Sequence, residues 1–146
     1  MIVNTPQQTF RAALGQFFVK ETNTENLAAA RSLIERSETA GADLLVLPEC
    51  IIARKLGMPD WGQKHAEPLD GPFVSGLREA TRGRRVTVVC TVQAKIANES
   101  RYANDLLVIQ NGELRLTYQK IHLYDAFRGK ESSYAAPGDV LPPVLQ

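Results

Sequence analysis

Residues 42–49 read Ala-Asp-Leu-Leu-Val-Leu-Pro-Glu, a run of four apolar residues that a proline closes. The run is short and apolar at every position, which is typical of a strand buried on both faces of a sheet. Residues 10–19 (FRAALGQFFV) form a similar, mostly apolar run, and we expect a second strand there that is also covered on both faces.

An amphipathic helix is predicted between these two strands. Asn23 or Thr24 can cap its first turn, and Gly41 follows its last turn, where glycine is common. Its apolar stripe consists of residues three and four positions apart, namely Leu27, Ala30 and Ile34. A strand, a helix and a second strand in about 40 residues predict a right-handed βαβ unit.

A long irregular loop is expected next, over residues 50–70, because this segment carries several Pro and Gly breaks. Loops of this length in compact domains tend to line functional sites. Gly71-Pro72 opens a second predicted helix, which runs to about Arg82.

The second half of the chain predicts further strands. Residues 86–92 are apolar and β-branched, and Asn111-Gly112 predicts a type I′ hairpin between residues 106–109 and 114–118. A last strand is expected near Val144. Up to the end of the hairpin, the order is β-α-β-α-β-β-β, which predicts an α/β layered domain with a mixed sheet.

Composition excludes several classes of protein. The chain has 146 residues, of which 44% are hydrophobic and 23% charged, and a formal net charge of +1. These values are those of a globular domain, and they leave no global charge for binding nucleic acid or an acidic membrane. No stretch approaches the roughly 20 apolar residues of a membrane span, and no secretory signal is recognised. We therefore expect a cytoplasmic protein.

Three charged residues are candidates for chemistry. Glu49 directly follows the strand of residues 44–47, where α/β folds build their sites, and it could serve as a general base. Lys120 could stabilise a developing oxyanion, and with strand periodicity it would share one face with His122 and Tyr124. Glu131 lies in a turn-rich segment. For each of the three, the alternative is an ordinary surface or turn residue, which is the more common case.

The two cysteines and two histidines give weaker signals. Cys90 lies inside an apolar strand and is expected to pack as a small hydrophobe. Cys50 adjoins Glu49, but neighbours in an extended chain point to opposite faces, so a contact requires a turn after Pro48. The spacing of His65 and His122 matches no recognised metal site, and no phosphate-binding glycine motif is present.

Several short segments, taken in order, resemble the nitrilase superfamily of carbon–nitrogen hydrolases. They are residues 13–16 (ALGQ), 42–49 (ADLLVLPE), 118–125 (YQKIHLYD), 131–132 (ES) and 137–139 (PGD). Their order and separations agree with the family across nearly the whole chain. Residues 122–127 (HLYDAF) and 129–139 (GKESSYAAPGD) are most similar to the branch of ω-amidases and deaminated-glutathione amidases.

The resemblance implies an α-β-β-α sandwich with a mixed sheet and helices, and catalysis by a Glu–Lys–Cys triad. It makes Glu49 the general base and Lys120 the oxyanion-stabilising residue, and it matches Glu131 to a second glutamate that positions the lysine and the substrate. It requires no metal and no organic cofactor. The nucleophilic cysteine of the family belongs to a later Cys-Tyr-Asp-type motif, which neither Cys50 nor Cys90 matches.

Residues 1–146 are therefore expected to form the N-terminal half of such a domain, ending before the nucleophile motif. The implied function is hydrolysis of a carbon–nitrogen bond in an amide or nitrile of a small carboxylic acid derivative, with this span alone inactive. The alternatives are a catalytically inactive, truncated relative that acts only as an association module, and a generic α/β small-molecule binder. Besides the small-molecule amide substrate, the expected partners are further copies of the chain or a complementary half.

Overall fold

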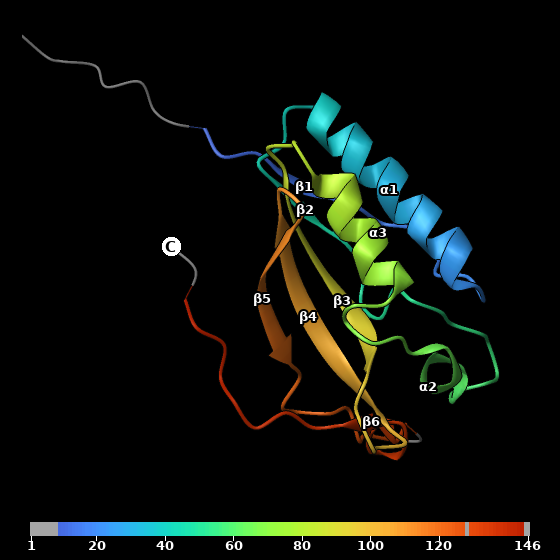
Figure 1. Cartoon of the computed structure of the whole chain (residues 1–146). Helices are drawn as coiled ribbons and strands as arrows, with labels where there is room; N and C mark the ends of the chain where they lie inside the picture. Colours follow the sequence, from blue (N-terminus) through green and yellow to red (C-terminus); the bar gives the residue numbers. More distant parts are fainter. Residues whose placement is uncertain (1–8, 128, 145–146) are drawn as a thin grey trace, which may run out of the picture.

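A computed structural model of the chain describes residues 9–127 and 129–144 (Figure 1). The elements are, in chain order, β1 (Ala12–Leu14), α1 (Asn23–Thr39), β2 (Leu44–Val46), α2 (Trp61–His65), α3 (Pro72–Thr81), β3 (Thr87–Lys95), β4 (Tyr102–Gln110), β5 (Glu113–Gln119), the 3₁₀ turn η1 (Glu131–Ser133) and β6 (Ala135–Ala136).

The strands form one six-stranded mixed sheet in the order β1-β2-β3-β4-β5, and β6 pairs with β4. β1, β2 and β3 run parallel, whereas β3, β4 and β5 are antiparallel neighbours. The parallel pair of β1 and β2, joined by α1, confirms the predicted βαβ unit. The predicted element order is confirmed as well, with α2 and β6 as additions.

α1 starts one residue earlier than the sequence indicates. The N-cap is Thr22 rather than Asn23 or Thr24, since Thr22 is extended and its hydroxyl accepts the N–H of Glu25 at 3.4 Å. Glu25 in turn accepts the Thr22 hydroxyl at 2.6 Å. The other end agrees with prediction: Gly41 has a φ of +68°, the left-handed conformation that ends helices.

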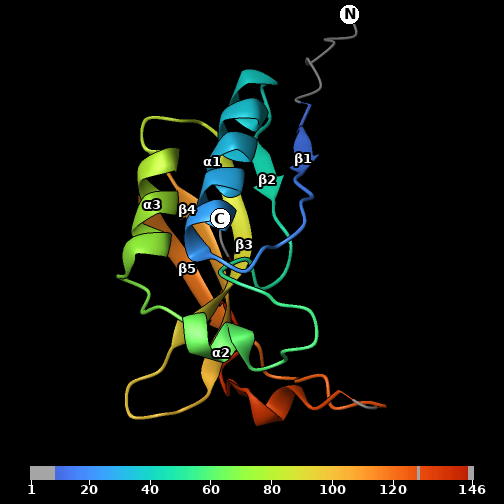
Figure 2. The same cartoon turned by 90° about the vertical axis from the view of Figure 1, so that its right-hand side faces the viewer.

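The first strand is shorter and more exposed than predicted. Only Ala12–Leu14 pair with β2, and the side chains of Leu14 and Phe18 are 83% and 75% exposed. β1 is an edge strand (Figure 2), so one of its two sides has no paired strand among the described residues. The expectation of a strand covered on both faces over residues 10–19 is therefore wrong for this chain.

The loop over residues 50–70 is more ordered than predicted. It contains α2, and its first part is in the core, because Ile51, Ile52 and Ala53 are almost fully buried. The ammonium of Lys55 lies 4.7 Å from the centre of the Trp61 ring, which closes the loop on itself.

The hairpin between β4 and β5 is as predicted. Asn111 and Gly112 have φ values of +48° and +79°, as a type I′ turn requires at both central residues. The strand expected near Val144 is absent from the described residues, and Ala135–Ala136 pair with β4 instead.

The two faces of the sheet have different environments. α1 and α3 cover one face (Figure 1), and the strand residues buried beneath them are Leu45, Val88, Cys90, Val92, Leu107 and Ile109. By the strand register, the opposite face carries a second apolar set, only partly buried: Leu44, Val46, Val89, Leu106, Val108, Leu116 and Tyr118. We call this set the open face. No described helix covers it, so the structure has a sheet and one helix layer.

Among the helices of the described residues, none has the length and apolar character needed to cross a bilayer.

Candidate active site

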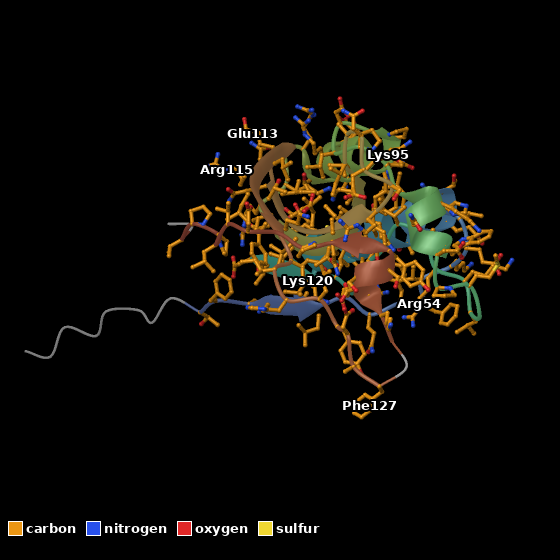
Figure 3. The ribbon with its side chains drawn as sticks, turned by 90° about the horizontal axis from the view of Figure 1, so that it is seen from below. Arg54, Lys95, Glu113, Arg115, Lys120 and Phe127 are labelled. Atoms are coloured by element: carbon orange, nitrogen blue, oxygen red, sulfur yellow. The ribbon has the colours of Figure 1, made fainter. Side chains whose placement is uncertain are left out.

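Glu49, Lys120 and Glu131 come together at one end of the sheet. The ammonium Nζ of Lys120 lies 3.1 Å from Glu49 Oε1 and 2.9 Å from Glu131 Oε2. The residues that the family resemblance makes the general base and the oxyanion-stabilising lysine are therefore in contact. Figure 3, seen from below, places Lys120 near the middle of this end of the molecule. We call these three residues the charged cluster.

A local bulge presents Glu49. The N–H of Leu47 donates to Val89 on β3 at 2.8 Å, and the N–H of Ile51 donates to the Thr91 carbonyl at 3.0 Å. Between these two bonds, Pro48 and Glu49 bulge away from the neighbouring strand β3. Cys50, with a φ of +54°, turns the chain back toward β3. The side chain of Glu49 is consequently 60% exposed.

The end of β5 holds Lys120. Its N–H donates to the Asn104 carbonyl and its carbonyl accepts the N–H of Gly138, both at 2.9 Å. Because β5 ends at Gln119, the strand alternation that would place Lys120, His122 and Tyr124 on one face does not continue. The sequence-based expectation about that shared face is therefore wrong, and His122 is exposed.

Glu131 is the most enclosed of the three, with a side chain that is 15% exposed. Its Oε2 accepts the N–H of Tyr124 at 2.6 Å in addition to the Lys120 ammonium. Burial raises the pKa of Glu131, but the Tyr124 N–H, the Lys120 ammonium and the Asn104 amide lower it more, so its pKa lies below the ordinary value. Glu131 is thus an anion that hydrogen bonds hold in place. It is not the exposed turn residue that the sequence left open as the alternative.

Lys120 is stabilised as an ammonium. Partial burial lowers the pKa of Lys120, but its hydrogen bonds to Glu131 and Glu49 raise it more, and the net shift is upward. A permanent cation beside an exposed carboxylate can donate hydrogen bonds to an oxyanion while the carboxylate exchanges a proton.

Two further residues of β4 belong to the site, and sequence reasoning did not identify them. The side-chain amide of Asn104 donates to Glu49 Oε1 at 2.8 Å and to Glu131 Oε1 at 3.2 Å. Burial, followed by the nearby Cys50 thiol and the two carboxylates, raises the pKa of Tyr102. The available signal was the polar pair Asn104-Asp105, which interrupts an otherwise apolar strand.

Cys50 lies beside the charged cluster because its left-handed backbone turns the chain after Pro48. Burial raises the pKa of its thiol to about 12, and the carboxylates of Glu49 and Glu131 add to the effect, while Lys120 and Thr91 oppose it. The thiol is therefore protonated at neutral pH and is a weak nucleophile. Cys90 is fully buried in β3, in agreement with its expected packing role, and burial raises its thiol pKa to about 12.

The structure shows a mixed sheet with a lysine between two glutamates at one end, and comparison with known proteins identifies the family of this fold. The model of the carbon–nitrogen hydrolase family matches residues 11–146, and the chain belongs to this family.

Two curated relatives are similar over most of this chain. The deaminated glutathione amidase of Escherichia coli O157:H7 is 32% identical over 134 residues, which are 92% of this chain and 51% of the relative. The omega-amidase NIT2 of Xenopus tropicalis is 27% identical over 139 residues, 89% of this chain and 48% of the relative. The chain thus spans about half the length of the curated relatives it matches.

Solved structures show the same fold. The crystal structure of an amidase from Nesterenkonia sp. superposes with a TM-score of 0.76 at 26% identity, covering 94% of this chain and 51% of the amidase. The nitrilase-type α/β fold expected from the sequence is confirmed.

Proposed function

We propose that this chain supplies the general base and the oxyanion-stabilising lysine of an amidase that hydrolyses carbon–nitrogen bonds. The observation that carries the proposal is the charged cluster, in which the Lys120 ammonium lies between Glu49 and Glu131. The assigned roles are those that the family resemblance implies: Glu49 as base, Lys120 as hydrogen-bond donor, and Glu131 as the residue that holds Lys120.

The reaction needs a cysteine thiol. In the family that this chain resembles, the cysteine belongs to a motif beyond the position that matches Gln146. Glu49 takes the thiol proton, and the thiolate attacks the carbonyl carbon of the amide. Lys120 donates to the resulting oxyanion, and the amine leaves as ammonia after receiving the proton from Glu49. Glu49 then activates a water molecule, which hydrolyses the thioester to the carboxylic acid and restores the thiol.

The substrate class is an amide of a small carboxylic acid derivative. The similarity to a deaminated glutathione amidase and to an omega-amidase supports amides at the end of a short, acid-bearing chain. A nitrile of similar size is the second substrate to be tested.

A second candidate function is that of an association module without catalysis. The observation that favours it is the open face of the sheet, whose apolar residues are only partly buried. Covering this face with a complementary half or with another copy would remove apolar surface from water.

The test is to express the reading frame beyond Gln146 and to assay the longer product on glutamine-like ω-amides and simple nitriles. We expect ammonia release that falls to background in Glu49→Gln and in Lys120→Met. Glu113→Gln, an exposed carboxylate on β5, is the matched control and should keep full activity. A stop codon directly after Gln146, or a longer product without activity, would favour the association module.

A further inference from the structure

Asn104 is the residue that contacts all three members of the charged cluster. It lies on β4, and only 2% of its surface is exposed. One N–H of its side-chain amide donates to Glu49 Oε1 at 2.8 Å, and the same nitrogen also donates to Glu131 Oε1 at 3.2 Å. Its backbone carbonyl accepts the N–H of Lys120 at 2.9 Å. A primary amide has two N–H donors, so both are used here.

The contacts of Asn104 leave the two oxygens of Glu49 unequal. Oε1 accepts from both the Asn104 amide and the Lys120 ammonium, whereas no partner of Oε2 is found among residues 9–127 and 129–144. An oxygen that accepts two hydrogen bonds is a poor site for a proton, because protonation would require breaking one of them. Oε2 is therefore the oxygen that is free to exchange a proton.

Asn104 also separates the two carboxylates. Glu49 and Glu131 both approach Lys120, and like charges at such a distance repel each other. The amide places a donor between them, so Glu49 and Glu131 each have a donor besides the one ammonium that they share. A buried amide whose nitrogen donates to both carboxylates holds these side chains in one arrangement.

We propose that Asn104 is the positioning residue of the site: it fixes the carboxylate of Glu49 so that Oε2 faces the reacting groups, and it keeps Lys120 between two carboxylates. The catalytic meaning of this proposal rests on the proposed function, whereas the positioning itself can be measured in this chain without any activity.

The first experiment follows the side-chain amide signals of ¹⁵N-labelled chain by NMR. Glu49→Gln and Glu131→Gln should each shift the Asn104 amide protons, because each replaces a charged acceptor by a neutral one. The internal control is the amide of Asn26, which is buried and donates to the backbone carbonyls of Lys20 and Ile52 at 2.9 Å. It should not move in either variant. An Asn104 signal that is unchanged in both variants would overturn the proposal.

The second experiment titrates Lys120 through its side-chain ¹³Cε signal. In Asn104→Leu the carboxylates lose their shared donor and separate from the ammonium, so the pKa of Lys120 should fall. Leu106→Ala is the matched control: Leu106 is on the same face of β4, and its loss should lower stability without moving the Lys120 titration. If Asn104→Leu does not fold, Asn104→Ser, which keeps one donor, replaces it and should give a smaller fall. A Lys120 titration that is unchanged in a folded Asn104 variant contradicts the proposal.

The third experiment uses the longer product that the test of the proposed function calls for. Loss of positioning should lower kcat by about 10²-fold with little change in KM, since the base is displaced while the substrate pocket remains. Asn104→Gln should recover part of the loss. If the NMR coupling is present but the longer protein is inactive, the proposed function fails and the positioning by Asn104 stands. If kcat is unchanged in Asn104→Leu, positioning is not needed for the reaction and the proposal fails.

Discussion

The side-chain oxygen of Gln93 on β3 accepts the N–H of Ile52 at 3.1 Å. The nitrogen of the same amide donates to the carbonyls of Cys50 and Ala53 at 3.2 and 3.1 Å. Gln93 is 3% exposed, so these bonds are shielded from water. One side chain of the sheet therefore fixes the backbone directly after Glu49, and the position of the proposed base depends on it.

Replacing Gln93 by Leu should destabilise the chain. The change leaves one N–H and two carbonyls of the buried segment without their partner, and each such loss costs about 1–3 kcal/mol. We expect a total of about 2–4 kcal/mol in chemical denaturation, because Cys50 is only partly buried and its carbonyl can bond to water once Gln93 is lost. Gln63→Leu on α2 is the control and should cost much less, because the partly exposed Gln63 makes one hydrogen bond, to the Ser100 carbonyl. Equal stability of the two variants would contradict this role of Gln93.

The charged cluster should give the chain a defined pH range of stability. Folding lowers the pKa of Glu131. Its contribution to the free energy of unfolding is therefore present above about pH 4 and is lost as the pH falls through the folded-state pKa. Since the pKa of Lys120 is raised, its contribution is present at lower pH and is lost as the pH rises through its folded-state value. Thermal melts between pH 2 and 11 measure both limits.

Glu131→Gln removes the acidic limit of this range, because the variant has no proton to bind at this position. Its stability curve should therefore be flatter than that of the parent chain below about pH 4. Glu79→Gln, which changes a carboxylate that is 67% exposed on α3, should leave the acidic limb of the curve as it is. Parallel acidic limbs for the parent and Glu131→Gln would show that Glu131 does not contribute.

The chain by itself should associate. Half-buried apolar residues cover the open face, and Phe10, Leu14 and Phe18 are more than two thirds exposed near the edge strand β1. We expect static light scattering to give a mass above that of the monomer. Val108→Lys should shift the mass toward the monomer because it places a charge on the open face, whereas Gln110→Lys, at the exposed hairpin, should not. A parent chain that is monomeric and melts cooperatively would contradict this expectation.

The 146-residue chain should hydrolyse amides no faster than background. Removing the nucleophile from a cooperating triad lowers the rate by about 10⁶-fold in the well-studied serine case, which is about 8 kcal/mol of barrier. Cys50 is the thiol that could replace it, but its raised pKa makes the thiolate rare at neutral pH. The assay compares the chain with Cys50→Ala on ω-amides and nitriles. Activity that disappears in Cys50→Ala would identify Cys50 as a nucleophile.

Local pattern is sufficient to predict most of the elements. The apolar run before Pro48, the helix ended by Gly41 and the Asn111-Gly112 turn are each decided by residues a few positions apart, and all three are present in the structure. The strands that differ most from prediction are β1 and the one expected near Val144. Whether a strand forms and is covered at these places depends on distant neighbours, which no local pattern contains.

Identifying the charged cluster required both the sequence and the tertiary structure. Family resemblance points to Glu49, Lys120 and Glu131, but their contact joins residues 71 positions apart, and only the pairing of β2, β3, β4 and β5 brings them together. The polar pair Asn104-Asp105 interrupts an apolar strand, but it does not reveal a role, because an asparagine in a strand becomes a positioning residue only through the residues that it contacts. Hydrogen bonds act over about 3 Å, so the fold and not the sequence spacing determines which groups can form them.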